Sequence, residues 1–519
     1  MTAPKKAEIV ILYKRGCQSD EGLVRFIENR LGADGYSVFI DRHVTLGVDW
    51  AREIESHIRS ADAIIPLLSS ESIHSEMLGF EIETAHEASQ LQGGRPSLLP
   101  VRVNYTGPLP EPLASILDPL QYYLWEGEQD SLGLATELAE TLKHLPVGET
   151  QATGSPQSAS RPAVTTAQLQ PRPSTGVARP AALESIGGAV PLDSQFYITR
   201  PVDNELVSSI SKSDSIVLIK GVRQMGKTSL MARGLQFARD QGLKAVSTDL
   251  QKFNAENFKT VDRLYRTFAE SISDQLELGI EPDSFWDARR GPNANLERYF
   301  RRELLGRLDT PLIWGLDEVD RLFVTPFGSE VFGLIRSWHN ERALDPSGPW
   351  SNLTICIAYA TEAHLFISDI NQSPFNVGTR LVLEDFTALQ VAELNRRYQS
   401  PIKSEEELSR FYRLVGGHPY LVRRGLHELA TRKISFDSFE QQAARDEAFY
   451  GDHLRRILVL LVRDPELTRV MRGVLENQPC PNPESFDRLR SAGLVTGHLP
   501  EEARPRCRLY AAFLRRHLM

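Results

Sequence analysis

Short aliphatic runs alternate with longer amphipathic segments over the first 145 residues of the chain. The runs have strand length, and the segments between them repeat their apolar positions with a helical period. The strand candidates are residues 8–13, 36–41, 62–69, 97–104 and 120–125. The helix candidates are residues 21–35, 49–61, 75–85, 110–118 and 132–145. Because parallel neighbours need a crossover element, this alternation predicts a flavodoxin-like α/β domain over residues 1–145.

A second strand–helix alternation predicts another α/β domain over residues 195–386. Its strand candidates are residues 215–220, 244–250, 311–317, 353–360 and 379–386. The stretch between the two domains, residues 146–194, is rich in Pro, Ser, Thr, Ala and Gln and almost free of apolar periodicity. It cannot bury enough apolar surface to offset its ordering entropy, so we expect a flexible, disordered linker.

The rest of the chain is predicted to be mostly helical. Residues 387–445 carry only helical periodicity and predict a helical lid domain. Residues 446–519 hold helices, then the segment FDRLRSAGLVTG, a strand-like RCRLY and a last helix. Helices followed by a β-hairpin are typical of a winged helix.

Composition narrows the class of protein. A chain of 519 residues is expected to form about three or four domains. The net charge of −9 argues against a dedicated nucleic-acid-binding protein. No apolar run approaches the roughly 20 residues that span a bilayer, and the N-terminal residues lack the order of a signal peptide, so we expect a cytoplasmic protein without membrane contact. The cysteines lie far apart without metal-ligand spacing: Cys17, Cys356, Cys480 and Cys507.

The strand at 215–220 leads into GVRQMGKTS and a helix, which is the phosphate-binding pattern GxxxxGK[ST] in its required context. Gly221 and Gly226 let backbone amides curl around a β-phosphate at the positive end of a helix. Lys227 would reach the β- and γ-oxygens, and Thr228 would ligate Mg²⁺. Ser229 is included in the predicted ATP-binding loop.

A second motif supports the ATP site. The apolar strand PLIWGLD ends in Asp317, which would hold the Mg²⁺ together with Thr228, and Glu318 would orient the attacking water. A Gly-rich turn with a solvated acidic loop is the plainer alternative, and the co-occurrence of both motifs disfavours it.

From residue 195 onward the chain resembles the STAND-class ATPases of the AAA superfamily, more narrowly the bacterial AAA-like group. The resemblance is carried by FYITRPVDNEL, GVRQMGKTSL, LDEVDRL, SPFNVGTRLVLEDFTALQVAEL, GGHPYLVRRGL, GDHLRRIL, AGLV and RCRLY. It implies ATP or ADP as ligand, with Arg200 at the base and Gly417, His418 and Pro419 approaching the nucleotide from the lid. After the fourth strand, Thr361 and Glu362 stand where relatives often carry arginine. We therefore expect a nucleotide-controlled switch that hydrolyses slowly.

Arginines are concentrated in the predicted winged helix and raise the alternative of a DNA-binding regulator. The ten are Arg455, Arg456, Arg463, Arg488, Arg490, Arg504, Arg506, Arg508, Arg515 and Arg516. Arginines also pair with acidic faces of neighbouring domains, and this is the interpretation that we prefer. We expect no DNA binding.

The segment SEMLGFEIETA, residues 75–85, predicts a helix with three carboxylates, Glu76, Glu81 and Glu83. It follows the third strand of a region that resembles a TIR domain through IVILYKRG and YSVFIDRHVTLGVDWAREIESHIRSADAIIPLLS. Leu12 replaces the serine common in that family. In active TIR domains this helix carries an apolar residue and, four residues later, the catalytic glutamate, which are Met77 and Glu81 here.

The resemblance implies cleavage of the nicotinamide N-glycosidic bond of NAD⁺, with Glu81 catalytic. Residues at the ends of the first two strands and in the loop that follows would contact the dinucleotide, namely Tyr13, Lys14, Arg15, Asp41 and Trp50. Met77 would lie beside it. Glu76 and Glu83 are predicted to point elsewhere and to matter little. The alternative is a non-catalytic TIR scaffold.

The combination predicts an effector controlled by a nucleotide switch. Relatives often complete TIR sites by self-association, so we expect oligomers built through the TIR and nucleotide-binding domains, activated by a trigger or sensor partner. Such a design resembles antiphage defence by NAD⁺ depletion. The sequence leaves open the trigger, the product (linear, cyclic or base-exchanged), the stoichiometry of the oligomer, and whether ATP is hydrolysed or only bound.

Overall fold

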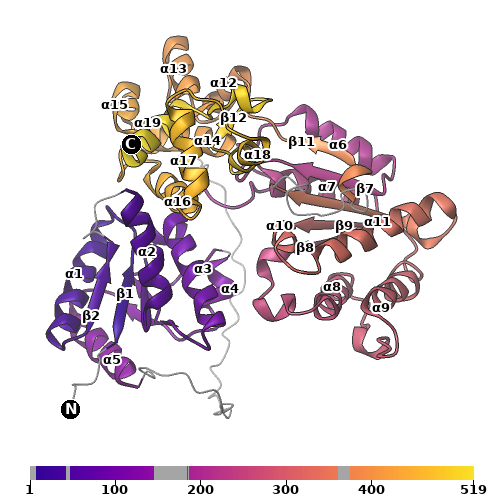
Figure 1. Ribbon diagram of the computed structural model, residues 1–519, viewed down its shortest axis with the longest axis horizontal. Helices are drawn as coiled ribbons and strands as arrows, with labels where there is room; N and C mark the ends of the chain where they lie inside the picture. Colours follow the sequence, from indigo (N-terminus) through magenta and orange to yellow (C-terminus); the bar gives the residue numbers. More distant parts are fainter. Residues whose placement is uncertain (1–6, 42–46, 111, 145–183, 185, 361–373) are drawn as a thin grey trace, which may run out of the picture.

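The computed structural model describes residues 7–41, 47–110, 112–144, 184, 186–360 and 374–519. Figure 1 shows the N-terminal domain in indigo, a second α/β domain in magenta and orange, and a yellow group of C-terminal helices that touches both. In the part of the chain that is described, no helix is long and apolar enough to cross a membrane.

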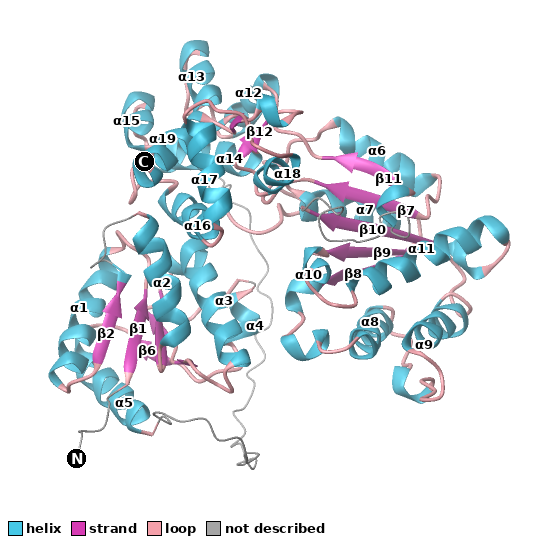
Figure 2. Ribbon diagram, viewed as in Figure 1, coloured by secondary structure: helices cyan, strands magenta, loops and turns pink. Residues whose placement is uncertain are grey.

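The N-terminal domain is built on a parallel sheet in the order β2-β1-β3-β5-β6, with β4 paired to β3 (Figure 2). This is the flavodoxin-like order, as predicted. Its strands are β1 (Glu8–Leu12), β2 (Ser37–Ile40), β3 (Ala63–Leu68), β4 (Ser97–Leu98), β5 (Val101–Val103) and β6 (Tyr123–Trp125). Its helices are α1 (Gln18–Ala33), α2 (Val48–Ser60), α3 (Glu76–Leu91), α4 (Leu113–Leu117) and α5 (Ser131–Lys143).

The sequence explains these elements locally. All six residues of the central strand β3, AIIPLL, are buried, because helices cover both faces of the sheet. In α2 the buried residues Trp50, Ile54 and Ile58 recur at a helical period and form one apolar face. Helix α3 begins where the Ser75 hydroxyl accepts a hydrogen bond from the Leu78 amide at 3.2 Å, which caps its first turn.

The second domain holds a parallel sheet in the order β11-β7-β10-β9-β8. All five predicted strands are present: β7 (Ile216–Lys220), β8 (Lys244–Asp249), β9 (Leu312–Asp317), β10 (Leu353–Tyr359) and β11 (Thr379–Val382). The helices are α6 (Pro201–Ser211), α7 (Lys227–Asp240), α8 (Val261–Gln275), α9 (Pro292–Tyr299), α10 (Asp320–Phe323) and α11 (Gly328–Leu344). Each side of the sheet packs on its own apolar cluster, as a parallel sheet covered on both faces requires.

The C-terminal part is helical apart from one short hairpin. It contains α12 (Ala388–Arg397), α13 (Glu405–Val415), α14 (Pro419–Arg432), α15 (Phe436–Gln442), α16 (Gly451–Val462), α17 (Pro465–Leu475), α18 (Pro483–Ser491), β12 (Val495–Thr496), β13 (Arg504–Pro505) and α19 (Arg508–Leu518). β12 and β13 pair antiparallel. Helices followed by a hairpin agree with the expected order of elements, and the assignment as a winged helix stays a prediction.

One buried apolar cluster continues from the N-terminal domain into the C-terminal helices. It joins residues of α2 and α3, such as Ile54 and Ile82, to Leu454 and Leu458 of α16. Helix α16 packs against both α2 and α3, and Figure 1 shows it above these two helices. The N-terminal domain and the C-terminal helices are therefore held together by packing.

The predicted linker extends too far. Residues 146–183 lie outside the described residues, but residues 186–194 pack on the second domain. The Val190 amide donates to Ser229 Oγ at 2.9 Å, and Arg233 Nη1 donates to the Val190 carbonyl at 3.0 Å. This segment is attached mainly through its backbone, so its sequence needs no apolar periodicity. The second domain therefore begins before residue 195.

The junction between the second domain and the lid provides a test of this packing. Gly417 has φ +76°, and an added Cβ would lie 2.3 Å from the Phe386 carbonyl oxygen. We expect Gly417→Ala to destabilise the domain by about 1–3 kcal/mol. Gly333→Ala, in α11 with nothing within 4 Å of the added Cβ, is the matched control and should stabilise by about 0.5–1 kcal/mol. Thermal unfolding of both variants measures this, and equal midpoints would contradict it.

Candidate functional site

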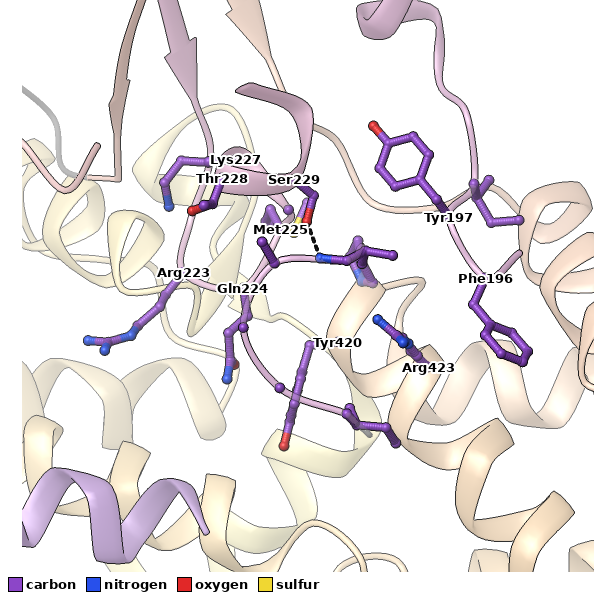
Figure 3. Close-up of a pocket in the computed structure, with 18 of the residues that line it drawn as sticks. Phe196, Tyr197, Arg223, Gln224, Met225, Lys227, Thr228, Ser229, Tyr420 and Arg423 are labelled. Atoms are coloured by element: carbon purple, nitrogen blue, oxygen red, sulfur yellow. Dashed lines mark hydrogen bonds between the residues drawn. The ribbon is translucent and has the colours of Figure 1, made fainter. Parts of the chain in front are cut away.

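A cavity of about 430 Å³ lies at the carboxyl end of the second sheet. That volume falls within the range of roughly 300–1,000 Å³ usual for small-molecule sites. The P-loop that follows β7 forms one wall and α14 of the lid another, as Figure 3 shows through Lys227, Thr228, Tyr420 and Arg423. The acidic residues at the end of β9, Asp317 and Glu318, line a third side. Open α/β sheets bind their ligands at this edge.

The P-loop has the geometry of a phosphate cradle. Gly226 has φ +92°, a conformation that side chains rarely adopt, and it precedes the first turn of α7. Lys227 is buried, and its Nζ lies 3.3 Å from the Val222 carbonyl. Burial lowers the pKa of Lys227, while the carboxylates of Glu318 and its neighbours oppose that shift. Arg200 lines the cavity and donates to the Met225 carbonyl at 2.9 Å, so it also fixes the loop.

The predicted magnesium ligands lie together. The Thr228 hydroxyl donates to Asp317 Oδ2 at 2.6 Å. Burial and the neighbouring Glu318 raise the pKa of Asp317 to about 6, against the lowering effect of the Thr228 hydrogen bond. A buried carboxylate paired with one hydroxyl is an oxygen donor set that suits Mg²⁺. The cradle, the lysine and this pair fit a magnesium nucleotide, which would supply the phosphates and the metal charge.

Glu318 is held in an uncommon conformation beside this pair. Its φ is +54°, and its amide donates to Asp317 Oδ1 at 2.9 Å. Such strain clusters at functional sites. Glu318 lines the cavity, in agreement with its predicted place near an attacking water.

The lid contributes one of the predicted residues and two others. The predicted Pro419 lines the cavity together with Tyr420 and Arg423, whereas the predicted His418 lines a smaller hollow of about 50 Å³ behind the P-loop. Burial and the nearby Arg506 lower the pKa of His418, so the buried ring is neutral. Gly221 and Gly417 shape the backbone and do not line the cavity.

Glu81 lies in the N-terminal domain at the carboxyl edge of its sheet, facing a narrow hollow with Tyr13 and Asp41. Arg15 Nε donates to Asp41 Oδ2 at 2.7 Å, and Lys14 Nζ donates to the Glu71 carbonyl at 3.3 Å. Glu81 is buried, with 3% of its surface exposed. Burial and the Asp41 carboxylate raise the pKa of Glu81 well above its ordinary value, against Arg455 and Arg15.

Trp50 and Met77, the other predicted NAD⁺ contacts, are buried in the apolar cluster shared with α16. The hollow beside Glu81 has essentially no volume for even a water molecule among the described residues. The loop residues 42–46 lie outside the described residues. In this conformation the described part of the predicted NAD⁺ site is closed.

Glu76 was predicted to matter little, but the structure places it in a buried ion-pair group. Its Oε2 lies 3.2 Å from His453 Nδ1 and 3.2 Å from Arg456 Nη1, both in α16. Burial alone would raise the pKa of Glu76, but His453, Arg456 and a hydrogen bond from Tyr420 hold it well below its usual range. The spacing of the two residues correctly predicted that Glu76 and Glu81 point in different directions. It could not show that Glu76 faces α16.

Further residues that line the cavity were not predicted, because the P-loop and the acidic strand end, which place the phosphate and metal groups, do not extend to them. They include His74, Ile186, Gly188, Val190, Phe196, Tyr197, Tyr420 and Arg423. Thr361 and Glu362, where relatives often carry arginine, lie outside the described residues.

The C-terminal arginines pair largely with acidic groups. Six form ion pairs with carboxylates: Arg455, Arg456, Arg463, Arg488, Arg506 and Arg516. Arg456 and Arg463 reach the N-terminal domain, at Glu76 and Glu55. This is the domain-pairing role that the sequence interpretation preferred, and the absence of DNA binding stays a prediction.

Comparison with known families agrees with the two α/β domains. Residues 185–516 match the AAA-like domain, and residues 9–136 match the TIR domain. A WD repeat-containing protein of Synechocystis, slr0143, whose function is uncharacterised, is 24% identical over 250 residues. That match covers 46% of this chain and 20% of the relative, so the chain spans about a fifth of the relative's length.

Among solved structures, the Walker-type ATPase paby2304 of Pyrococcus abyssi is 17% identical, with a TM-score of 0.44. The match covers 61% of this chain and 95% of that one. AMPPCP-bound DnaA of Aquifex aeolicus is 14% identical, with a TM-score of 0.31 over 52% of this chain and 75% of the other.

The Thr228–Asp317 pair yields a test of the nucleotide site. Asp317→Asn removes the negative charge that would face a metal but keeps the shape, so we expect the Mg²⁺-dependent gain in nucleotide affinity to fall by about tenfold or more, with metal-free binding little changed. Titration calorimetry with and without Mg²⁺ measures both. Asp240→Asn, at the far end of α7, is the control. An unchanged Mg²⁺ effect would remove Asp317 from the metal site.

Proposed function

The chain belongs to the AAA-like family and carries a TIR domain at its N-terminus, and from this we propose that it is a TIR effector that cleaves NAD⁺ under the control of a nucleotide switch. In the conformation described, the effector is held inactive. The observation that carries the proposal is the position of α16, which packs on the two TIR helices that bear Trp50 and Glu81.

Helix α16 acts as a cover over Glu81. Arg455 and Asp452 of α16 are close enough to influence the Glu81 carboxyl electrostatically. Arg463, just after α16, forms an ion pair with Glu55 of α2 at 2.8 Å and stacks its guanidinium on Phe80 of α3 at 5.0 Å. These contacts leave no room for a dinucleotide beside Glu81 among the described residues. Activity therefore requires that α16 and the TIR domain separate.

The proposed reaction needs one carboxylate. The C1′–N bond between ribose and nicotinamide breaks, and its electron pair leaves with the nitrogen to give neutral nicotinamide. The oxocarbenium character that develops at C1′ is stabilised by ionised Glu81. Attack by water gives ADP-ribose and releases a proton. Attack by the adenine ring or by another base gives the cyclic or exchanged product.

The environment of Glu81 supports the inactive state in a second way. Because burial and Asp41 raise its pKa, the carboxyl keeps its proton to higher pH than an exposed glutamate. A neutral carboxyl stabilises a cation poorly. Removing α16 would return water to Glu81 and lower the pKa, which favours the ionised form.

The nucleotide domain supplies the control in this proposal. The cavity beside Lys227, Thr228 and Asp317 fits ATP or ADP with Mg²⁺. Once released, the TIR domains are proposed to associate with those of other copies, in response to a trigger or sensor partner, and to deplete NAD⁺ in antiphage defence. DNA binding is not part of the proposal, because Arg456 and Arg463 are used between domains.

Glu81→Gln tests the catalytic assignment. The full-length protein is assembled by a fused oligomerisation domain and incubated with ATP and Mg²⁺, the proposed opening signal, and nicotinamide release from NAD⁺ is followed. We expect the wild type to release nicotinamide and Glu81→Gln to lose at least about a hundredfold of that rate, because the amide cannot carry the negative charge. Glu53→Gln, an exposed carboxylate of α2, is the control and should match the wild type.

Two outcomes would contradict the assignment. Equal release by Glu81→Gln and wild type would place the chemistry elsewhere. No release from oligomers verified by light scattering would favour the alternative of a non-catalytic TIR scaffold.

A further inference from the structure

Helix α3 of the TIR domain lies along the nucleotide site. His74 and Glu76, just before and at its start, line the same cavity as Lys227 and Glu318. Near its other end, Gln90 Oε1 accepts a hydrogen bond from the Ala255 amide, after β8, at 3.3 Å. The helix thus reaches from the lid to the far side of the nucleotide-binding domain, and the TIR domain forms part of the wall of the cavity.

The first turn of α3 is anchored where the lid and α16 meet. Glu76 contacts His453 and Arg456, and His453 Nε2 in turn lies 2.7 Å from the Tyr510 hydroxyl of α19. The hydroxyl of Tyr420, which lines the cavity, also donates a hydrogen bond to the Glu76 carboxylate. One carboxylate therefore ties together the TIR domain, the lid and the C-terminal helices.

Glu83 lies two helical turns after Glu76, on the same side of α3. It is half-buried and interacts electrostatically with Arg223 of the P-loop, with Arg456, and with Glu318 and Arg321 after β9. Lys227 interacts with Glu318 and Arg223 as well. Because the P-loop lysine reaches the β- and γ-phosphates, these shared neighbours place Glu83 on the γ-phosphate side of the site.

We propose that α3 senses the terminal phosphate, so that the docked TIR domain accepts a nucleoside diphosphate and is displaced by a nucleoside triphosphate. A γ-phosphate adds negative charge in front of Glu76, which lines the cavity, and competes with Glu83 for the P-loop arginine, Arg223. Figure 3 shows Arg223 projecting from the P-loop, with the indigo ribbon of the N-terminal domain below it in this view. The inference rests on the proposed nucleotide control and names the residues that carry it to the TIR domain.

Because docking and nucleotide binding are thermodynamically linked, the proposed sensor can be tested by measuring nucleotide affinity. If the triphosphate weakens docking, then the docked protein binds the triphosphate more weakly than the undocked protein does, by the same factor. A diphosphate, which lacks the γ-phosphate, does not carry this loss of affinity. Couplings of this kind change affinity by roughly 5- to 150-fold. Neutralising Glu83 removes charge opposite the γ-phosphate and leaves the groups that hold the β-phosphate untouched.

The test uses the full chain. Dissociation constants for ADP and for AMPPCP, both with Mg²⁺, are measured by calorimetry for the wild type, Glu83→Gln, Glu76→Gln and the control Glu53→Gln. We expect the wild type and the control to bind ADP at least about tenfold more tightly than AMPPCP. Glu83→Gln should reduce that ratio to about twofold or less by gaining AMPPCP affinity, with ADP affinity unchanged.

Small-angle X-ray scattering gives an independent readout that needs no catalysis. AMPPCP should increase the radius of gyration of the wild type, ADP should not, and Glu76→Gln should be expanded with either nucleotide. If the wild type and Glu83→Gln bind both nucleotides with the same ratio of dissociation constants for ADP and AMPPCP, the sensor is overturned. The proposed NAD⁺ cleavage is not affected by that result. If neither nucleotide binds, both the switch and the sensor are overturned.

Discussion

The packing of α16 against α2 and α3 is the contact on which the other features depend. Its apolar part, which includes Ile54, Ile82 and Leu454, is continuous with the cores of the N-terminal domain and of the C-terminal helices. Its polar part is a buried group around Glu76, with His453 and Arg456. Apolar burial supplies the free energy of docking, whereas a buried ion pair adds little net stability but is costly to break. Glu76 therefore makes the docked position specific.

A contact built in this way can be switched by one charge. The closed hollow at Glu81 and the wall that α3 adds to the nucleotide cavity belong to the same helix, five residues apart at Glu76 and Glu81. Because Glu76 and Glu81 lie on one helix, a movement that carries α3 away from both the P-loop and α16 would expose both sites. A difference of about 1.4 kcal/mol between two nucleotides shifts the docked fraction tenfold, and a single unfavourable charge near a phosphate is large enough to provide it.

The sequence predicted what depends on local pattern. The order of strands and helices, the P-loop at Gly226 to Thr228 and the carboxylates after β9 follow from periodicity and from short motifs, and the structure places them as expected. The roles of Glu76 and Glu83 depend on residues more than 130 positions away, such as Arg223 and His453. No local pattern encodes such a pairing. Residues 186–190 were assigned to the linker because they bind through their backbone.

Amide hydrogen–deuterium exchange in α3 and α16 tests the central claim, that one covering contact links the nucleotide to the TIR site. The full-length protein is compared with ADP and with AMPPCP, each with Mg²⁺. We expect both helices to be protected with ADP and to lose protection together with AMPPCP, while the strands β1 and β3 stay protected. Unchanged protection of α3 and α16 in the two nucleotide states, with both nucleotides shown to be bound, would contradict the account.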